Sequence, residues 1–249
     1  MINWNFVIVF NEIFNEFLQS NAIIFGTTSE NVPYHANIVF LNNQNLGGNG
    51  GGSIISQRHI LTAGSRVVGF VSWTVTIGSN TRELGNVVPV TSGVAHSGYV
   101  NSPRANDIGI LTLLNNLVFT PFVQPIALPG MNLTLPWENE QGTIVGFGGT
   151  PSINTPTLQA AFKRVVSPAL CLARWPTVAL AQQFCSEDSR IRSDVCNGDL
   201  GGGFTVLTRG QEVLVGIASV AHCSTTAVSP SLYTRVTAYR SWIREQINI

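Results

Sequence analysis

Short strand-like segments separated by turn signals run through this chain from Ile23 almost to its end. In residues 71–77 apolar and polar side chains alternate strictly, which is the pattern of a half-buried β-strand. Further strand-like segments lie at residues 37–41, 54–61, 83–94, 108–114, 142–147, 162–166, 204–207 and 213–220. The period changes near the end, where one helical face is marked by Val236, Tyr239, Trp242, Ile243 and Ile247. The pattern predicts an all-β fold of two packed β-barrels closed by a C-terminal helix.

Length and composition indicate a globular unit without a large net charge. The 249 residues can bury a large core in one structural unit, and 44% of them are hydrophobic. Only 10% are charged, the formal net charge is +0, and the 13 lysines and arginines form no basic stripe. We therefore expect no nucleic-acid partner. No apolar run reaches the roughly 18 residues that a membrane span needs.

A run rich in glycine covers residues 47–52. It lacks the lysine of a phosphate-binding loop, and its spacing does not fit GxGxxG followed by a helix. The run therefore predicts a flexible loop and gives no reason to expect a nucleotide.

The first 22 residues leave several readings open. Residues 4–10 are apolar, but no lysine or arginine precedes them and acidic and amide residues follow at once. Ser20-Asn21-Ala22 resembles a small-residue cleavage site. Residues 1–22 are a leader or signal peptide, an amphipathic segment packed on the domain, or a wrongly joined first exon. The domain itself is expected to cover residues 23–249.

All four cysteines lie in the last third of the chain, at positions 171, 185, 196 and 223. None shows the spacing of a zinc site, so we expect no metal. An even count in a turn-rich chain predicts two disulfides and an oxidising compartment. Spacing alone leaves all three connectivities open.

Several short motifs occur along the chain in a characteristic order. They are Ile-Ile-Phe-Gly at residues 23–26, Gly-Gly-Ser-Ile-Ile-Ser at 51–56, Leu-Thr-Ala-Gly-Ser-Arg at 61–66, Asn-Asp-Ile-Gly-Ile-Leu at 106–111, Gly-Phe-Gly at 146–148, Cys-Asn-Gly-Asp-Leu-Gly-Gly at 196–202 and Tyr-Thr-Arg-Val at 233–236. Together they resemble the chymotrypsin/trypsin family of serine proteases over residues 23–247. The resemblance implies two packed six-stranded antiparallel β-barrels, about 23–127 and 128–235, with a C-terminal helix at about 236–248.

The catalytic triad of that family needs a serine nucleophile, a histidine base and an aspartate. By the resemblance these positions hold Leu200, Ser65 and Asp107. A leucine has no hydroxyl and cannot form an acyl-enzyme. The backbone N–H groups of Gly198 and Leu200 would still form an oxyanion hole, although the leucine side chain is expected to fill part of the cleft. The resemblance therefore implies a non-catalytic homologue, a pseudoprotease.

No other histidine is an obvious replacement for the base. His59 lies on a strand-like segment and is expected to pack there. His96 precedes a Ser-Gly-Tyr sequence and is expected in a surface loop, and His35 is expected on the surface of an N-terminal strand. His222 lies beside Cys223 on the rim of the pocket that the resemblance implies, where contact with a ligand is the less favoured alternative.

The substrate pocket of the family is matched by Asp194, Ser219, Ala221 and Ser231. Trypsin-like members carry an aspartate at the pocket base, so Asp194 could select an arginine or lysine side chain by charge-assisted pairing. Val220, Ala221 and Ser231 replace smaller or different residues and add bulk to the pocket walls. The favoured interpretation is a vestigial pocket, with binding of a basic residue as the alternative.

By the same resemblance, Asp199 is the buried aspartate that receives an N-terminal ammonium, which here would be that of Ile23. Ala22 precedes Ile23, so a tryptic activation site is absent. Cleavage by signal peptidase after Ala22 would free Ile23 without a zymogen step. The alternative is that Asp199 serves as a turn residue for its hydrogen bonds.

The resemblance also implies the disulfides Cys171–Cys185 and Cys196–Cys223. Asn132 begins an Asn-Leu-Thr glycosylation sequon, which is usable only if the chain is secreted.

These observations predict a secreted, extracellular, monomeric serine-protease homologue without catalysis or cofactor. Its role would be to bind a protein or peptide as a cofactor, decoy or regulator of an extracellular proteolytic system. Two alternatives remain open. One is a trypsin-like serine endopeptidase with an unorthodox site, and the other is an inert structural or secretory protein.

Overall fold

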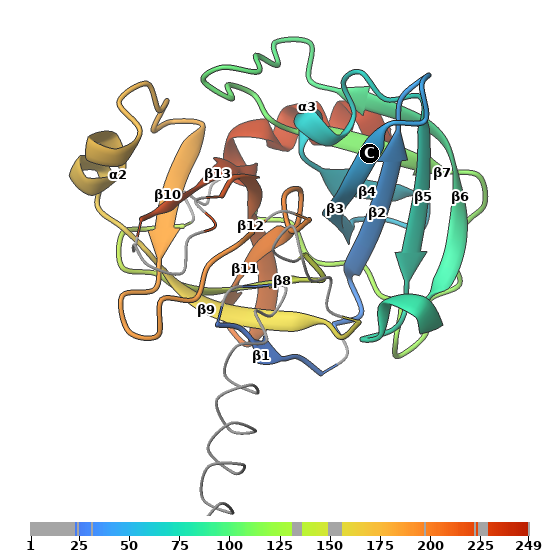
Figure 1. Cartoon of the computed structure of the whole chain (residues 1–249), viewed down its shortest axis with the longest axis horizontal. Helices are drawn as coiled ribbons and strands as arrows, with labels where there is room; N and C mark the ends of the chain where they lie inside the picture. The colour runs from blue at the N-terminus through green and yellow to red at the C-terminus, as the bar shows by residue number, and fades with distance from the viewer. Residues whose placement is uncertain are drawn as a thin grey trace, which may run out of the picture.

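Two β-barrels lie side by side in the computed structural model (Figure 1). The structure describes residues 23, 25–30, 32–130, 136–148, 156–196, 198–221, 223 and 229–248. The first barrel closes in the order β2-β3-β4-β7-β6-β5. Its strands are β2 (His35–Leu41), β3 (Gly47–Ile54), β4 (His59–Thr62), β5 (Ser72–Ile77), β6 (Asn86–Ala95) and β7 (Gly109–Leu113). Each neighbouring pair is antiparallel, as the sequence pattern predicts.

The second barrel also has six antiparallel strands, and β8 closes it by pairing with both β9 and β11. Its strands are β8 (Gln141–Gly146), β9 (Gln159–Val165), β10 (Gln183–Glu187), β11 (Gly203–Thr208), β12 (Gln211–Val220) and β13 (Ser231–Arg235). A short strand, β1 (Thr27–Thr28), extends this sheet beside β9. Phe184, Phe204 and Tyr233 fill its core, and each ring lies within 5.5 Å of the other two, measured between centroids. The fold class predicted from the sequence is therefore confirmed.

The C-terminal helix lies over the junction of the two barrels. It begins as a 3-10 turn (Val236–Tyr239) and becomes the α-helix α3 (Arg240–Ile247), so its α-helical part starts later than the sequence pattern indicated. Tyr239 and Ile243 share one hydrophobic cluster with residues of both barrels, including Leu61 and Ile217. A second helix, α2 (Pro168–Arg174), is capped by Ser167, whose Oγ accepts a hydrogen bond from the backbone N–H of Leu170. None of the helices in these ranges is long and apolar enough to cross a membrane.

The expectation of a flexible loop at residues 47–52 is wrong, because these glycines form most of β3. Other parts of the molecule approach this strand closely enough to exclude side chains. A Cβ on Gly51 would lie 2.7 Å from the Cα of Gly202, and one on Gly52 would lie 2.6 Å from Cγ2 of Ile60. Gly51 is needed for close packing against the second barrel and Gly52 for close packing within the first, so neither is there for flexibility.

We expect Gly51→Ala to destabilise the fold by about 1–3 kcal/mol, because the added methyl group meets backbone atoms that cannot rotate away. Gly48→Ala is the matched control, since a Cβ there makes only ordinary contact at 3.4 Å with the ring of Phe40. That control should be neutral, or stabilising by about 0.4–1 kcal/mol. Urea unfolding of both variants measures the difference, and equal free energies would contradict the packing argument.

Candidate functional site

Asp107 lies at the junction of the two barrels, where two elements supply the hydrogen-bond donors to its carboxylate. The carboxylate is fully buried. It accepts 2.7 Å and 3.3 Å hydrogen bonds from the backbone N–H and Oγ of Ser65, which lies in a 3-10 turn (Gly64–Arg66) after β4. It also accepts a 2.5 Å bond from Oγ of Ser219 on β12. Hydroxyls and an amide hold this carboxylate in place, but none of these groups can take up a proton near neutral pH.

Leu200 occupies a tight loop beside this cluster. Gly198 and Gly201, on either side of it, have φ angles of +93° and +92°, which strongly favour glycine. The carbonyl of Leu200 accepts a 2.9 Å bond from the backbone N–H of Gly51, so the loop is attached to the first barrel. The half-buried Leu200 side chain packs against the core of the second barrel. This aliphatic group offers no nucleophile to the site.

None of the three histidines in the described part of the chain contacts Asp107. His59 is half-buried on β4, and its Nδ1 lies 2.7 Å from Oγ of Ser56. The ring of His96 packs at 5.5 Å against Tyr239 and Trp242. The fourth histidine, His222, lies outside the described residues, as do Asn132 and residues 1–22.

The expectation of a surface position for His35 is wrong. Its ring is buried under Phe147 of the second barrel, with 5.6 Å between the ring centroids. Burial, assisted by the nearby charge of Arg82, lowers the pKa of His35 to about 4. A neutral imidazole in this position has a packing role.

Asp199 is fully buried, and it accepts hydrogen bonds from the backbone N–H groups of Gly148 and Cys196 at 2.8 Å and 2.9 Å. Burial raises the pKa of Asp199 to about 7, although these hydrogen bonds and the charge of Arg82 act against the rise. Ile23 is fully buried in the core of the second barrel.

This raised pKa predicts a dependence of stability on pH. An unfolded aspartate has a pKa of about 3.9, so between about pH 4 and pH 7 the folded chain holds a proton that the unfolded chain has released. The stability from this group is complete below about pH 4 and is lost as the pH rises through about 7. We expect the unfolding free energy of the natural chain to fall relative to that of Asp199→Asn by on the order of 2–4 kcal/mol across this window.

Urea unfolding at several pH values measures this slope. A chain beginning at Ile23 is the informative comparison: if its free ammonium reaches Asp199, the pKa of Asp199 falls and the difference flattens. Parallel curves for the natural chain and Asp199→Asn would contradict the assignment.

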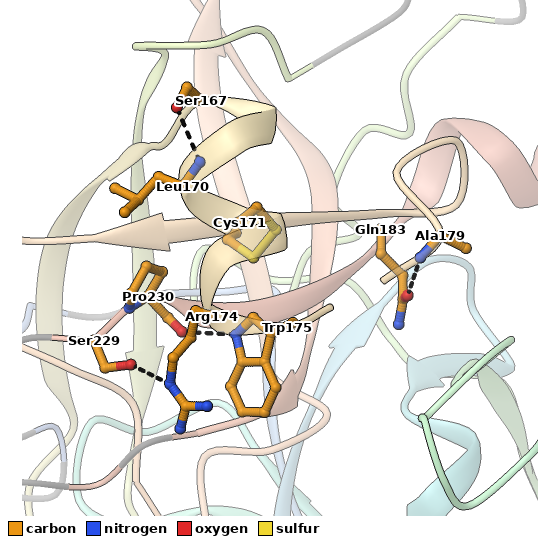
Figure 2. Close-up of a disulfide and its surroundings, with 10 residues drawn as sticks. Ser167, Leu170, Cys171, Arg174, Trp175, Ala179, Gln183, Ser229 and Pro230 are labelled. Carbon is orange, nitrogen blue, oxygen red and sulfur yellow. Dashed lines mark hydrogen bonds between the residues drawn. A yellow bond between two sulfur atoms is a disulfide. The ribbon is translucent and has the colours of Figure 1, made fainter. Parts of the chain in front are cut away.

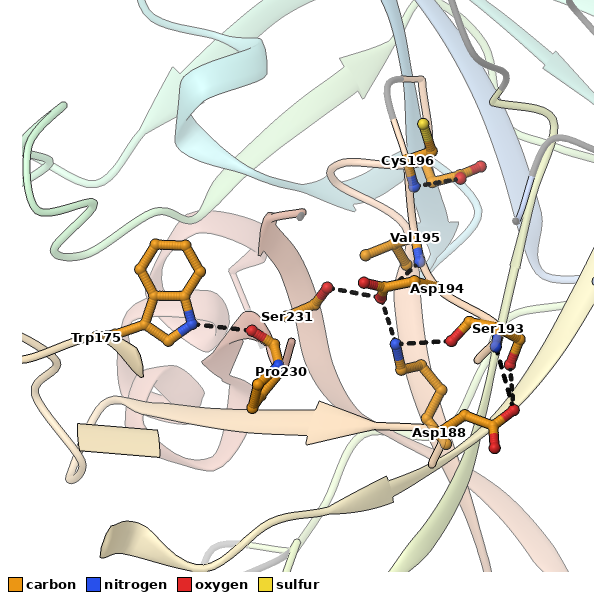
Figure 3. Close-up of polar contacts among 10 residues, drawn as sticks. Trp175, Asp188, Ser193, Asp194, Val195, Cys196, Pro230 and Ser231 are labelled. Carbon is orange, nitrogen blue, oxygen red and sulfur yellow. Dashed lines mark hydrogen bonds and ion pairs between the residues drawn. The ribbon is translucent and has the colours of Figure 1, made fainter. Parts of the chain in front are cut away.

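Asp194 is buried and already paired with a cation of the same chain. Its Oδ1 accepts hydrogen bonds from Ser231 Oγ at 2.7 Å and from its neighbour Val195 N–H at 2.8 Å (Figure 3). The same oxygen forms an ion pair with Nζ of Lys163 on β9. Burial lowers the pKa of Lys163, and the charge of Asp194 opposes that effect. The sequence analysis missed Lys163, although its inward position follows from the alternating burial along β9.

The other expected pocket residues differ in burial and in hydrogen-bond partner. Ser231 and Ser219 are fully buried, but their hydroxyls donate to different carboxylates, those of Asp194 and Asp107. Ala221 is partly exposed and packs on the core of the second barrel. No group of three histidine, cysteine or acidic side chains suited to a metal ion occurs among the residues that the structure describes.

Both expected disulfides are present, Cys171–Cys185 and Cys196–Cys223. The first connects α2 to β10. Near it, Trp175 donates its indole N–H to the carbonyl of Pro230 at 3.0 Å (Figure 2). These contacts fix the segment that leads into β13 and Ser231.

A surface cavity of about 560 Å³ lies between β9, residues 138–141 and residues 187–191, and Lys163 is among its lining residues. Its lining includes no residue that donates a hydrogen bond to Asp107. The cavity is therefore separate from the cluster at the barrel junction.

Two six-stranded barrels with a buried aspartate between them define the chymotrypsin-like fold. The trypsin family model matches residues 24–243, and the chain belongs to this family.

Several known proteins are similar to it. CLIP domain-containing serine protease B9 of Anopheles gambiae is 30% identical over 225 residues, covering 79% of this chain and 55% of that protein. The chain thus spans about half the length of that relative. Chymotrypsin of Phaedon cochleariae is 31% identical over 201 residues, covering 78% and 70%. Collagenase of Hypoderma lineatum is 29% identical over 202 residues, covering 80% and 76%.

Solved structures agree with these sequence matches. HL collagenase superposes with a TM-score of 0.83 at 27% identity and covers 91% of this chain and 99% of its own. The structure titled GrC superposes with a TM-score of 0.79 at 26% identity, covering 90% and 99%.

Proposed function

We propose that this protein is a secreted, non-catalytic homologue of the trypsin family that acts by binding a protein or peptide. The observation that carries the proposal is the environment of Asp107. Its carboxylate is held by Ser65 and Ser219, with no histidine of the described residues beside it. Leu200 replaces the nucleophile. Acyl transfer by the family mechanism requires both missing groups.

Residual catalysis would be too small to be useful. Proteases stripped of triad residues retain roughly 10³–10⁴-fold acceleration over water, from the oxyanion hole and substrate binding alone. Uncatalysed peptide hydrolysis is so slow that this acceleration gives no practical turnover. The scaffold itself is intact, which supports reuse of its surface for binding.

Composition and disulfides support an extracellular protein partner. Both disulfides suit an oxidising compartment. The net charge of +0 and the absence of a basic stripe in the sequence disfavour nucleic acid. A cofactor, decoy or regulator in an extracellular proteolytic system fits these properties, with the protein acting as a monomer.

The test is chemical labelling of the purified protein. A fluorophosphonate probe should leave it unlabelled, and a fluorogenic arginine substrate should be hydrolysed no faster than in a buffer blank. HL collagenase or another active member of the family serves as the positive control. Stoichiometric labelling at any serine would overturn the proposal.

The rival candidate is a peptidase with Ser65 as its nucleophile, since Ser65 Oγ lies 3.3 Å from Asp107 Oδ2. Loss of labelling in Ser65→Ala would identify that mechanism. A third possibility is an inert protein without a ligand. Pull-downs from the native fluid with wild type and Asp194→Ala would distinguish a binding protein from an inert one, because an inert protein captures nothing specific in either form.

A further inference from the structure

Lys163 is the only lysine in a sequence with 13 lysines and arginines. Lysine is almost never fully buried in proteins unless it is paired. Lys163 nevertheless points into the second barrel from β9 and is only 2% exposed, while its neighbours Phe162 and Arg164 face outward. The single lysine side chain of this sequence is therefore buried in the protein interior.

The ammonium of Lys163 lies beside the carboxylate of Asp194. Nζ of Lys163 forms an ion pair with Oδ1 of Asp194 and donates a 3.2 Å hydrogen bond to the carbonyl of Ser193. Ser231 Oγ and Val195 N–H complete the donors around the same carboxylate oxygen (Figure 3). The charge of Asp194 is thus compensated from within the chain, by a residue of β9.

We propose that Lys163 determines the ligand specificity of the site at Asp194: it compensates the charge of this carboxylate, so that the site excludes arginine and lysine side chains and takes an uncharged one. This inference rests on the proposed function, since it names the side chain that a bound partner would present.

The exclusion follows from charge. A second cation at Asp194 would either share one carboxylate with Lys163 and be repelled by it, or displace an ammonium that is already desolvated and hydrogen-bonded. An uncharged side chain meets no such repulsion, because the carboxylate of Asp194 already has donors in Ser231 and Val195.

The experiment uses p-aminobenzamidine, a fluorescent cation whose emission rises when it is bound out of contact with water. The full chain should show no saturable binding. Lys163→Met keeps most of the side-chain volume but removes the ammonium, and it should bind the probe at least about tenfold more tightly. Lys163→Met/Asp194→Asn is the matched control, because it removes the carboxylate as well and should lose the gained binding.

Saturable binding by the full natural chain, equal to that of Lys163→Met, would overturn the proposal. A folded Lys163→Met that does not bind the probe would overturn it as well. Amine labelling covers the case in which the variants do not fold. Because Lys163 is the sole lysine, the amines that an acetylating reagent can modify are its Nζ and the α-amine. Lys163 should be protected in the native chain and react after denaturation, whereas labelling at the rate of the α-amine would refute its burial.

This outcome is separable from the proposed function. Probe binding reports the charge of the pocket base, while fluorophosphonate labelling reports the nucleophile. An active enzyme with a neutral pocket, and an inactive homologue with an acidic pocket, would each give a distinct pair of results.

Discussion

The double variant Ser65→His/Leu200→Ser should hydrolyse an activated ester at least about 100-fold faster than the natural chain. The reason is that the third member of the triad is already in place. Asp107 is buried, and Ser219 holds one of its oxygens at 2.5 Å. Its two oxygens also accept from the backbone and hydroxyl of Ser65, so an imidazole at that position starts beside its orienting carboxylate.

Each single variant should remain at the rate of the natural chain, because triad residues act as a unit and their effects are not additive. The substrate should carry a short uncharged side chain such as alanine, in keeping with the neutral pocket base. Initial rates and fluorophosphonate labelling provide two independent measurements.

Asp107→Asn added to the double variant is the decisive control. It keeps the shape but favours the wrong imidazole tautomer, and should lower the gained rate by up to about 10⁴-fold. An unchanged rate would show that the activity came from elsewhere. A folded double variant with no gain over either single variant would mean that the cleft has diverged beyond these two positions.

The sequence predicted the fold well because its signals are local and periodic. Strict alternation in residues 71–77 lies in β5, and the change of period after Val236 marks the terminal helix. The glycine run failed as a prediction because its reason is tertiary. No local pattern shows that a Cβ on Gly51 would lie within 3 Å of backbone atoms of residue 202, which is 151 positions away.

The candidate site was predictable in position but not in its contacts. Motif order placed Ser65, Asp107 and Leu200, yet Ser219 had been assigned to the pocket and its bond to Asp107 joins residues 112 positions apart. Lys163 was missed for a related reason. Its inward direction depends on the register of β9, and its partner Asp194 lies in a loop whose path no alternation pattern describes.

Among single substitutions near the pocket, removal of the Lys163 ammonium should destabilise the fold most. We expect Lys163→Met to cost about 3–5 kcal/mol, because the buried carboxylate of Asp194 loses the cation that pairs with it among the described residues and keeps its desolvation penalty. For a chain of this size that corresponds to a fall in melting temperature of roughly 6–20 °C. Thermal unfolding followed by circular dichroism measures it.

The double variant Lys163→Met/Asp194→Asn separates charge from packing. An amide at this position still accepts hydrogen bonds from Val195 N–H and Ser231 Oγ, but it needs no counter-charge. At least half of the lost stability should therefore return. Arg164→Met is the control for losing a cation on the same strand, and because Arg164 is exposed it should change stability by no more than about 0.5 kcal/mol. If the double variant were as unstable as Lys163→Met alone, packing of the lysine stem, and not its charge, would be what holds the pocket base together.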